Sequence, residues 1–334
     1  MICPHCNRNV KRKERTDRKC GSCHKRFALE PKENTLNLHD VRMMKLATQL
    51  GNNGGYRYTT TQLWYAAARK ALRKAGRFPV GAFVFALIAV PVLGVLGGVL
   101  DTPFLWAIAA VLTLGWLLYL TVRIARRNHR VVMPRMTHRD FVTSVLDQWR
   151  TTYGGDVPGV VREDIVRIDG PPAQPSLVVL CPDHSALVGL YANDVPRRHN
   201  VALAARPDQV PAGVPVVLLH DVSVPGYRFA ADARAALGGR VVGDLTPRPS
   251  AAKAAKAAIR LRHHAPPPEV LRWLRASDLL AEADVEWLAR GWWSPVAALR
   301  PSALVGRVAA AVQRSGDPDR RAAAAVGFLT WPGA

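Results

Sequence analysis

The stretch Leu177-Val178-Val179-Leu180-Cys181 decides the predicted fold of the C-terminal half, because it is an unbroken apolar run of strand length. Similar runs follow at 201–204, 216–219 and 240–243, and segments with helical spacing of apolar residues lie between them. Short continuous apolar strands that alternate with helices are typical of a parallel sheet covered on both faces. We therefore expect an α/β domain within residues 134–314, followed by a tail at 315–334. A helix capped by Thr137 and ended by Gly154 should precede its strands, and C-terminal helices, the first from Ser250 to Arg260, should complete it.

Ligands of such sheets bind beyond the carboxyl ends of the strands. The residues that we expect there are polar or reactive: Cys181, Pro182, Asp183, His220, Asp221 and Ser223. No G-x-G-x-x-G, P-loop or G-x-S-x-G motif accompanies the strands, so the signatures of nucleotide-binding proteins and of α/β hydrolases are missing.

The order of elements over residues 175–246 resembles the Toprim fold. The run Asp221-Val222-Ser223-Val224-Pro225-Gly226 keeps the first aspartate and the proline-glycine turn of that family, but Ser223 replaces its second acid. Cys181-Pro182-Asp183 stands where the family carries a glutamate. Because Mg²⁺ is held best by several carboxylates, the resemblance implies a degenerate relative without catalysis. A Rossmann-like sheet of other ancestry remains an alternative.

The N-terminus carries two C-x-x-C units, Cys3-Pro4-His5-Cys6 and Cys20-Gly21-Ser22-Cys23, separated by thirteen residues. Residues 1–30 resemble the zinc-ribbon family on this spacing. Four protein thiolates complete a tetrahedral site, which is typical of structural rather than catalytic Zn²⁺. A segment this short has too small a core to fold alone, so we expect the metal to supply most of its folding free energy and Phe27 to fill its interior.

The formal net charge of +21 is extreme for 334 residues. Basic residues are dense within the predicted ribbon: Arg8, Lys11, Arg12, Lys13, Arg15, Arg18, Lys19, Lys25 and Arg26. Such a surface favours phosphate groups, which are found in nucleic acid and in lipid headgroups. Nucleic acid, a protein and the lipid bilayer are therefore all candidate partners.

Residues 78–124 predict a transmembrane hairpin. No charged side chain occurs in 78–100 or in 103–122, and each run is long enough for a helix to cross a bilayer. Basic residues flank both runs, which predicts that both termini are cytoplasmic. Gly94 and Gly98 form a G-x-x-x-G pair that allows close helix contact and a homodimer. A pair of buried helices in a soluble core is the alternative.

Residues 37–77 predict a basic helical segment in which Thr60 or Thr61 caps the second helix. Its order of helix, turn and basic helix is compatible with a winged-helix-like unit. The run Thr61-Gln62-Leu63-Trp64-Tyr65 resembles the tyrosine-bearing helix of the type IIB topoisomerase A subunit family, although that family usually has an arginine at the position of Thr61. The alternative is that Trp64 and Tyr65 only pack against the rest of the protein.

Together these features predict a bacterial inner-membrane protein, because the Ala-, Arg- and Pro-rich composition is typical of GC-rich bacterial genomes. The expected architecture is a zinc ribbon, a two-helix transmembrane hairpin and a cytoplasmic α/β domain. Its expected role is binding or regulation, without enzymatic activity. The alternative is a membrane-tethered DNA-cleaving enzyme related to topoisomerases, with Tyr65 as nucleophile and Asp183 and Asp221 holding Mg²⁺.

Overall fold

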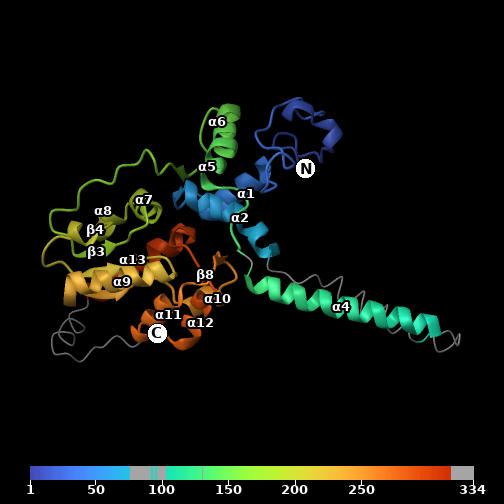
Figure 1. Ribbon diagram of the computed structural model, residues 1–334. Helices are drawn as coiled ribbons and strands as arrows, with labels where there is room; N and C mark the ends of the chain where they lie inside the picture. Colours follow the sequence, from blue (N-terminus) through green and yellow to red (C-terminus); the bar gives the residue numbers. More distant parts are fainter. Residues whose placement is uncertain (76–91, 93–94, 96–102, 130, 317–334) are drawn as a thin grey trace.

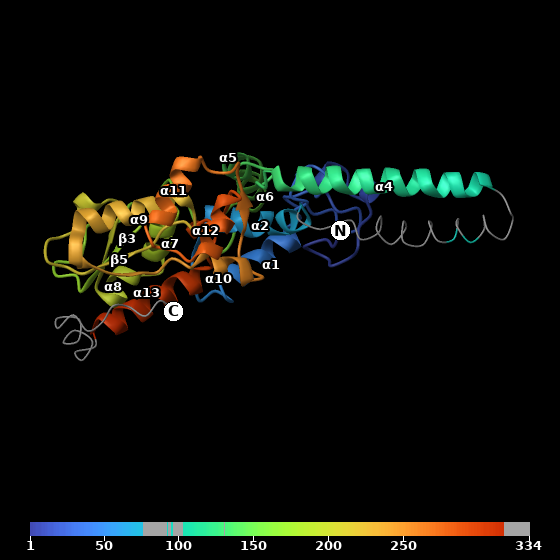
Figure 2. The same cartoon turned by 60° about the horizontal axis from the view of Figure 1, so that its bottom comes forward.

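The computed structural model of the protein describes residues 1–75, 92, 95, 103–129 and 131–316. A small N-terminal module, a helical body and an α/β unit lie next to one another, and one long helix extends away from them (Figure 1). The second view shows the same extension of this helix (Figure 2).

A four-stranded parallel sheet forms the centre of the α/β unit. Its strands are β3 (Leu177–Leu180), β4 (Val201–Ala204), β5 (Val216–Leu218) and β6 (Val241–Asp244). Their spatial order is β4-β3-β5-β6, and all neighbouring pairs are parallel. The four apolar runs of the sequence therefore form these strands as predicted, each within one or two residues of its expected bounds.

Helices cover both faces of this sheet. Side chains of successive strand residues point to opposite faces, so Val179 packs with α7 (His184–Ala192) and α13 (Pro301–Gly316), while Val178 packs with α9 (Val224–Leu237). The short α8 (Val195–His199) precedes β4. Two 3₁₀ turns complete the unit: η4 (Pro207–Gln209) and η5 (Gly238–Arg240).

The helical body combines segments from both sides of residues 76–130. Its elements are α1 (Asp40–Leu50), α2 (Thr60–Ala75), α5 (His138–Phe141), the π turn η3 (Val142–Leu146) and α6 (Asp147–Tyr153). They share one hydrophobic core in which Tyr58, Leu63 and Phe141 are fully buried. Strand β1 (Tyr58–Thr59) pairs in parallel with β2 (Val160–Val161). The segments that precede and follow residues 76–130 thus fold as one body.

The predicted ends of these helices follow their capping residues. The Thr137 hydroxyl accepts a hydrogen bond from the Asp140 N–H at the start of α5. Helix α2 begins at Thr60, and its capping side chain is Thr59 rather than the predicted Thr60 or Thr61, because the Thr59 hydroxyl accepts the Gln62 N–H at 3.2 Å. Helix α6 ends at Gly154, whose φ of +74° is a left-handed conformation that glycine adopts without strain.

The C-terminal segment is less helical than its sequence indicates. It contains α10 (Pro249–Ala254), β7 (Leu261–Arg262), α11 (Pro268–Ala276), α12 (Glu282–Ala289), β8 (Trp292–Trp293) and η6 (Val296–Ala298). The helix expected from Ser250 to Arg260 stops at Ala254. Tertiary packing prevails over helix propensity here, because Ile259 and Leu261 are buried in the core of the helical body.

The described residues correct the membrane prediction. Helix α4 (Pro103–His129) extends from the body, and its exposed side chains include many large hydrophobic ones: Phe104, Val111, Leu112, Leu114, Leu117, Leu118, Tyr119 and Val122. Nevertheless, no helix within the described ranges combines the length and the apolar character needed to cross a bilayer. This contradicts the transmembrane hairpin and, with it, the two-pass inner-membrane localisation and the membrane-anchored function.

The criterion of the prediction was the absence of charge. The finding concerns each described helix as a whole, and only part of the predicted hairpin lies within the described residues. In addition, α4 continues past Val122 into a basic turn that contains Arg123, Arg126 and Arg127. Apart from positions 92 and 95, the first expected span, with Gly94 and Gly98, lies outside the described residues.

Candidate functional site

The four N-terminal cysteines lie together as a candidate metal centre. Their sulfur atoms all lie within 4.8 Å of one another, and the Cys3–Cys23 and Cys6–Cys20 sulfur pairs are each 3.8 Å apart. A tetrahedron of thiolates at the usual Zn–S distance of about 2.3 Å has edges of about 3.8 Å. The sulfur positions are therefore consistent with a zinc ribbon and could hold a metal ion such as zinc.

Each C-x-x-C unit forms the same tight turn. The residue after the second cysteine, Asn7 or His24, has a φ near +57°, and its N–H donates to the carbonyl of the first cysteine. The Cys3 N–H then donates to the Arg8 carbonyl, as the Cys20 N–H does to the Lys25 carbonyl. The two units are thus a structural repeat, offset by seventeen residues. Two 3₁₀ turns connect them: η1 (Arg12–Glu14) and η2 (Thr16–Arg18).

The surroundings of the sulfur atoms differ. Hydrogen bonds from the backbone of Cys23 and Ser22 lower the pKa of Cys20 to about 6, whereas burial raises the pKa of Cys3 to about 11. A divalent cation binds thiolates, so its binding would release the remaining protons. Val10 is buried beside the sulfurs. Phe27 is buried as predicted, with 2% of its surface exposed.

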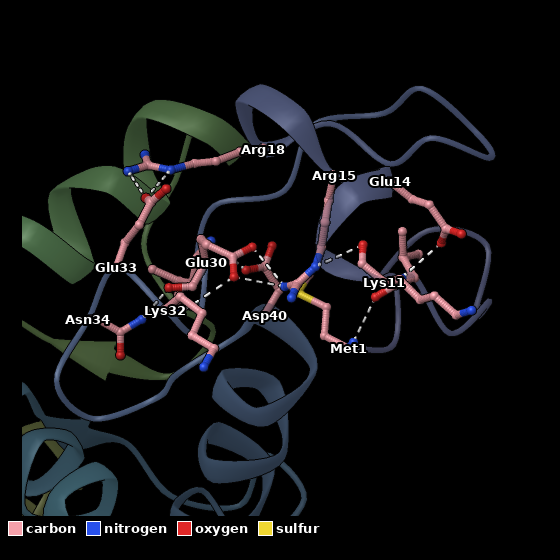
Figure 3. Close-up of polar contacts among 12 residues, drawn as sticks. Met1, Lys11, Glu14, Arg15, Arg18, Glu30, Lys32, Glu33, Asn34 and Asp40 are labelled. Atoms are coloured by element: carbon pink, nitrogen blue, oxygen red, sulfur yellow. Dashed lines mark hydrogen bonds and ion pairs between the residues drawn. The ribbon is translucent and has the colours of Figure 1, made fainter.

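Buried polar contacts fix the ribbon to the helical body. The Arg15 Nη1 donates to both carboxylate oxygens of Glu30 at 2.7–2.8 Å, its Nε donates to the Lys11 carbonyl, and the Arg15 and Glu30 side chains are largely buried. The Asp40 carboxylate, at the start of α1, accepts the N–H groups of Ala28 and Leu29 at 2.8 Å each. Figure 3 shows these residues between the ribbon and α1. Sequence reasoning missed Asp40, because nothing local distinguishes it from an ordinary residue of a first helical turn.

Most basic side chains of the ribbon remain free of carboxylates. Only Arg15 and Arg18 form ion pairs there, and Arg18 binds Glu33 (Figure 3). The other basic residues of the ribbon are exposed: Arg8, Lys11, Arg12, Lys13, Lys19, Lys25 and Arg26. The ribbon therefore presents an uncompensated positive surface.

Tyr65 on α2 lies within electrostatic reach of Asp183 and Asp221, which follow strands β3 and β5. Burial, followed by the charges of Asp221 and Asp183, raises the pKa of Tyr65, of which only 8% is exposed. Burial also raises the pKa of both aspartates, and that of Asp183 reaches about 6. The raised phenol pKa disfavours the phenolate, which is the form in which a phenol is the stronger nucleophile.

Both aspartates have structural partners. Asp183 caps α7 by accepting the Ala186 N–H at 2.7 Å, and Asp221 accepts the Val296 N–H at 2.7 Å. Among the described residues, the cysteine set alone brings three or more potential ligands within metal-binding distance. Within the described ranges, the acidic edge therefore contains no group of three or more carboxylate ligands that could enclose a metal ion. The DNA-cleaving alternative also loses its predicted membrane tether.

The remaining residues of the Toprim-like run have clear structural roles. The Ser223 hydroxyl accepts the Gly226 N–H and caps α9. A Cβ at Gly226 would lie 2.1 Å from the Asp221 carbonyl oxygen, so only glycine fits this turn. Capping and close packing thus account for the serine and glycine of this run.

The sequence analysis expected His220 at this edge, and it missed the two acidic residues Asp244 and Glu163. His220 is fully buried, and its Nε2 lies 3.1 Å from Asp244 at the end of β6. Glu163 accepts hydrogen bonds from the Thr61 backbone and hydroxyl and from the Ser185 hydroxyl, each at 2.9 Å. Asp244 would have been predicted at this edge if the last predicted strand had been one residue longer. Glu163 has no local signal in the sequence.

A cavity of about 920 Å³ lies away from both sites, beside the edge strand β4. Its lining includes Arg57, Ile168, Asp169, Tyr191 and Leu203. None of the predicted site residues lines it. The thiol cluster places four ligand atoms in a defined geometry and so points to a specific ligand. The open cavity does not identify a ligand.

Comparisons with known proteins add no assignment. No protein family matches the chain, and neither a curated protein nor a solved structure shows significant similarity to it. The zinc-ribbon resemblance therefore depends on the cysteine geometry, and the Toprim resemblance gains no support from a related structure.

Proposed function

We propose that this chain is a zinc-ribbon protein that binds nucleic acid through its basic N-terminal module. The observation that carries the proposal is a closed set of four thiols in a segment whose exposed basic residues have almost no carboxylate partners. Zn²⁺ is the cation that four thiolates in tetrahedral positions select. It would hold the two tight turns together and so fix the positions of the surrounding basic side chains.

The charge of this module matches a polyanion. Residues 1–26 contain nine Lys or Arg and two Asp or Glu. Each basic side chain that contacts a phosphate releases a condensed counterion, which makes affinity fall steeply with salt. Contacts to phosphates carry no sequence information, so we expect binding with little dependence on base sequence.

The test is fluorescence polarisation with a labelled DNA duplex at several salt concentrations. The triple variant Lys11→Gln, Arg12→Gln, Lys13→Gln removes three exposed charges from the ribbon. Its matched control removes three exposed charges beyond the sheet domain, at Lys253, Lys256 and Arg260. The slope of log K against log salt should fall by about 2 to 3 in the ribbon variant and change little in the control.

Metal removal supplies an independent arm of the test. Chelation should abolish salt-sensitive binding together with the fold of the ribbon, and one equivalent of Zn²⁺ should restore both. If the duplex binds equally well to the wild type, the ribbon variant and the chelated protein, the proposed function is wrong. Absence of binding in all of them would instead favour a protein partner for the ribbon.

A further inference from the structure

A second positive cluster lies on α2, outside the ribbon and the acidic edge. Arg69 and Arg73 are four residues apart, which places them on the same face of this helix one turn apart. Arg300 precedes α13, and its charge acts on Arg69. A hydrogen bond of 2.9 Å from the Gln62 side chain, two turns earlier on α2, to the Leu299 carbonyl attaches the residue before Arg300 to this helix.

This cluster has no internal counter-charge. Over the described part of the chain, Arg69, Arg73 and Arg300 form no ion pair with a carboxylate, although eleven ion pairs occur elsewhere. The Nε of Arg69 is buried and has no hydrogen-bond partner. A buried donor without an acceptor is rare in folded proteins and costs free energy.

The charges of the cluster also oppose one another. Burial, and then the charges of Arg300 and Arg73, lower the pKa of Arg69. A guanidinium remains protonated in proteins under all ordinary conditions. The protein therefore holds three like charges together at a cost, and an anion bound among them would remove both the repulsion and the unpaired donor.

We propose that Arg69, Arg73 and Arg300 form a binding site for a phosphate group. Planar guanidinium groups match the oxygens of phosphate in paired hydrogen bonds, and the Arg69 Nε supplies a donor that no protein group uses. This site is separate from the ribbon, so its existence does not depend on the proposed function of the metal centre.

The neighbouring Tyr65 defines one end of the site. It lies one turn before Arg69 on α2, and no described group forms a hydrogen bond with its hydroxyl. Asp183 and Asp221 act on Tyr65 from the sheet edge and repel an anion there. The phosphate would therefore bind toward Arg69 and Arg300, with the tyrosine hydroxyl available at the boundary.

The experiment is isothermal titration of the full-length, metal-loaded chain with inorganic phosphate, glycerol 3-phosphate and a single-stranded tetrathymidylate. Chloride at matched ionic strength controls for general screening. Loss of a hydrogen-bonded charge typically weakens binding by about tenfold or more. We expect this loss in Arg69→Gln and Arg300→Gln, and a smaller loss in Arg69→Lys, which keeps the charge but lacks the Nε donor.

The matched control is Lys70→Gln, because Lys70 is exposed on the same helix next to Arg69. Its phosphate affinity should stay within about twofold of the wild type. Circular dichroism checks that Arg69→Gln folds, and Arg300→Gln serves if it does not, since Arg300 is exposed. If glycerol 3-phosphate or tetrathymidylate binds and the binding depends on Arg69 or Arg300, the site is supported. The ligand that binds more tightly shows whether the phosphate belongs to a small monoester or to a nucleic-acid backbone. Equal affinity for phosphate and chloride, or an equal loss in Lys70→Gln, would overturn it.

Discussion

Asp40→Ala should destabilise the junction between the ribbon and the helical body by several kilocalories per mole. Asp40 is 1% exposed, and its carboxylate accepts two backbone N–H groups at 2.8 Å and the Tyr153 hydroxyl. Burial and the nearby carboxylate raise the pKa of Tyr153, so this hydroxyl stays protonated and donates. The alanine variant leaves three polar groups without their acceptor.

The magnitude follows from the number of donors. A hydrogen bond to a charged group contributes about 1.5–3 kcal/mol, and a buried donor left unpaired costs about 1–3 kcal/mol. For two buried N–H groups and a partly exposed phenol, we expect a loss of about 3–6 kcal/mol in the free energy of unfolding. Asp40→Asn keeps one acceptor oxygen and should lose about 1.5–3 kcal/mol. Tyr153→Phe removes one donor and should lose about 1–2 kcal/mol.

Urea unfolding followed by circular dichroism measures these losses, and retained metal after dialysis reports on the ribbon. The double variant Asp40→Ala, Tyr153→Phe supplies the internal control. Groups that share one hydrogen bond are not additive, so its loss should be smaller than the sum of the two single losses. A loss under about 1 kcal/mol in Asp40→Ala, or full additivity in the double variant, would refute the assignment of these contacts.

Three further predictions follow from the described contacts. Replacing Cys3 and Cys6 by serine should abolish stoichiometric zinc, measured by mass spectrometry of the purified protein, while the far-UV signal of the sheet domain remains; zinc retained in this variant would place the ligands elsewhere. Asp183→Asn keeps the cap of α7 but removes a carboxyl whose pKa rises from 3.8 to about 6 on folding. Because the wild type loses stability as pH rises through this window, the variant should be more stable by at most about 3 kcal/mol at pH 8 and equal to it below pH 4; a pH-independent difference contradicts the cause. Gly226→Ala should lower stability by about 3 kcal/mol or more, because its Cβ would meet the Asp221 carbonyl, whereas Gly306→Ala on α13 meets nothing and should raise stability by about 0.5–1 kcal/mol.

The parts that the sequence predicted correctly are those with a local physical cause. The strands around Leu177 and Val216 are continuous apolar runs, and Thr137 and Gly154 mark the ends of their helices through capping and left-handed backbone. The cysteine spacing likewise brings four sulfurs together in one short segment. In each case the residues that determine the structure lie within one turn or one strand.

The features that were missed depend on contacts between distant segments. The fully buried Ile259 and Leu261 end a helix that their own propensities would continue. In the sequence, Asp40 resembles an ordinary residue at the start of a helix. Its contact with Tyr153, which is distant in the chain, becomes visible only in the structure. The membrane prediction depended on two runs without charge, and no helix within the described ranges has the length and apolar character that it required. The effect of the Arg300 charge on Arg69 is a further long-range feature that no local pattern indicates.

Contacts between distant parts of the sequence set an order of folding during synthesis. The Tyr58 hydroxyl donates to the Pro158 carbonyl, and the Gln62 side chain donates to the Leu299 carbonyl, so the sequence separations are 100 and 237 residues. At about 5–20 residues per second, tens of seconds pass on the ribosome between emergence of the ribbon and of residue 299. The metal-binding turns can close early from local contacts alone. The helical body, in contrast, has to wait for nearly the whole chain, and its apolar surfaces are open to chaperones throughout that interval.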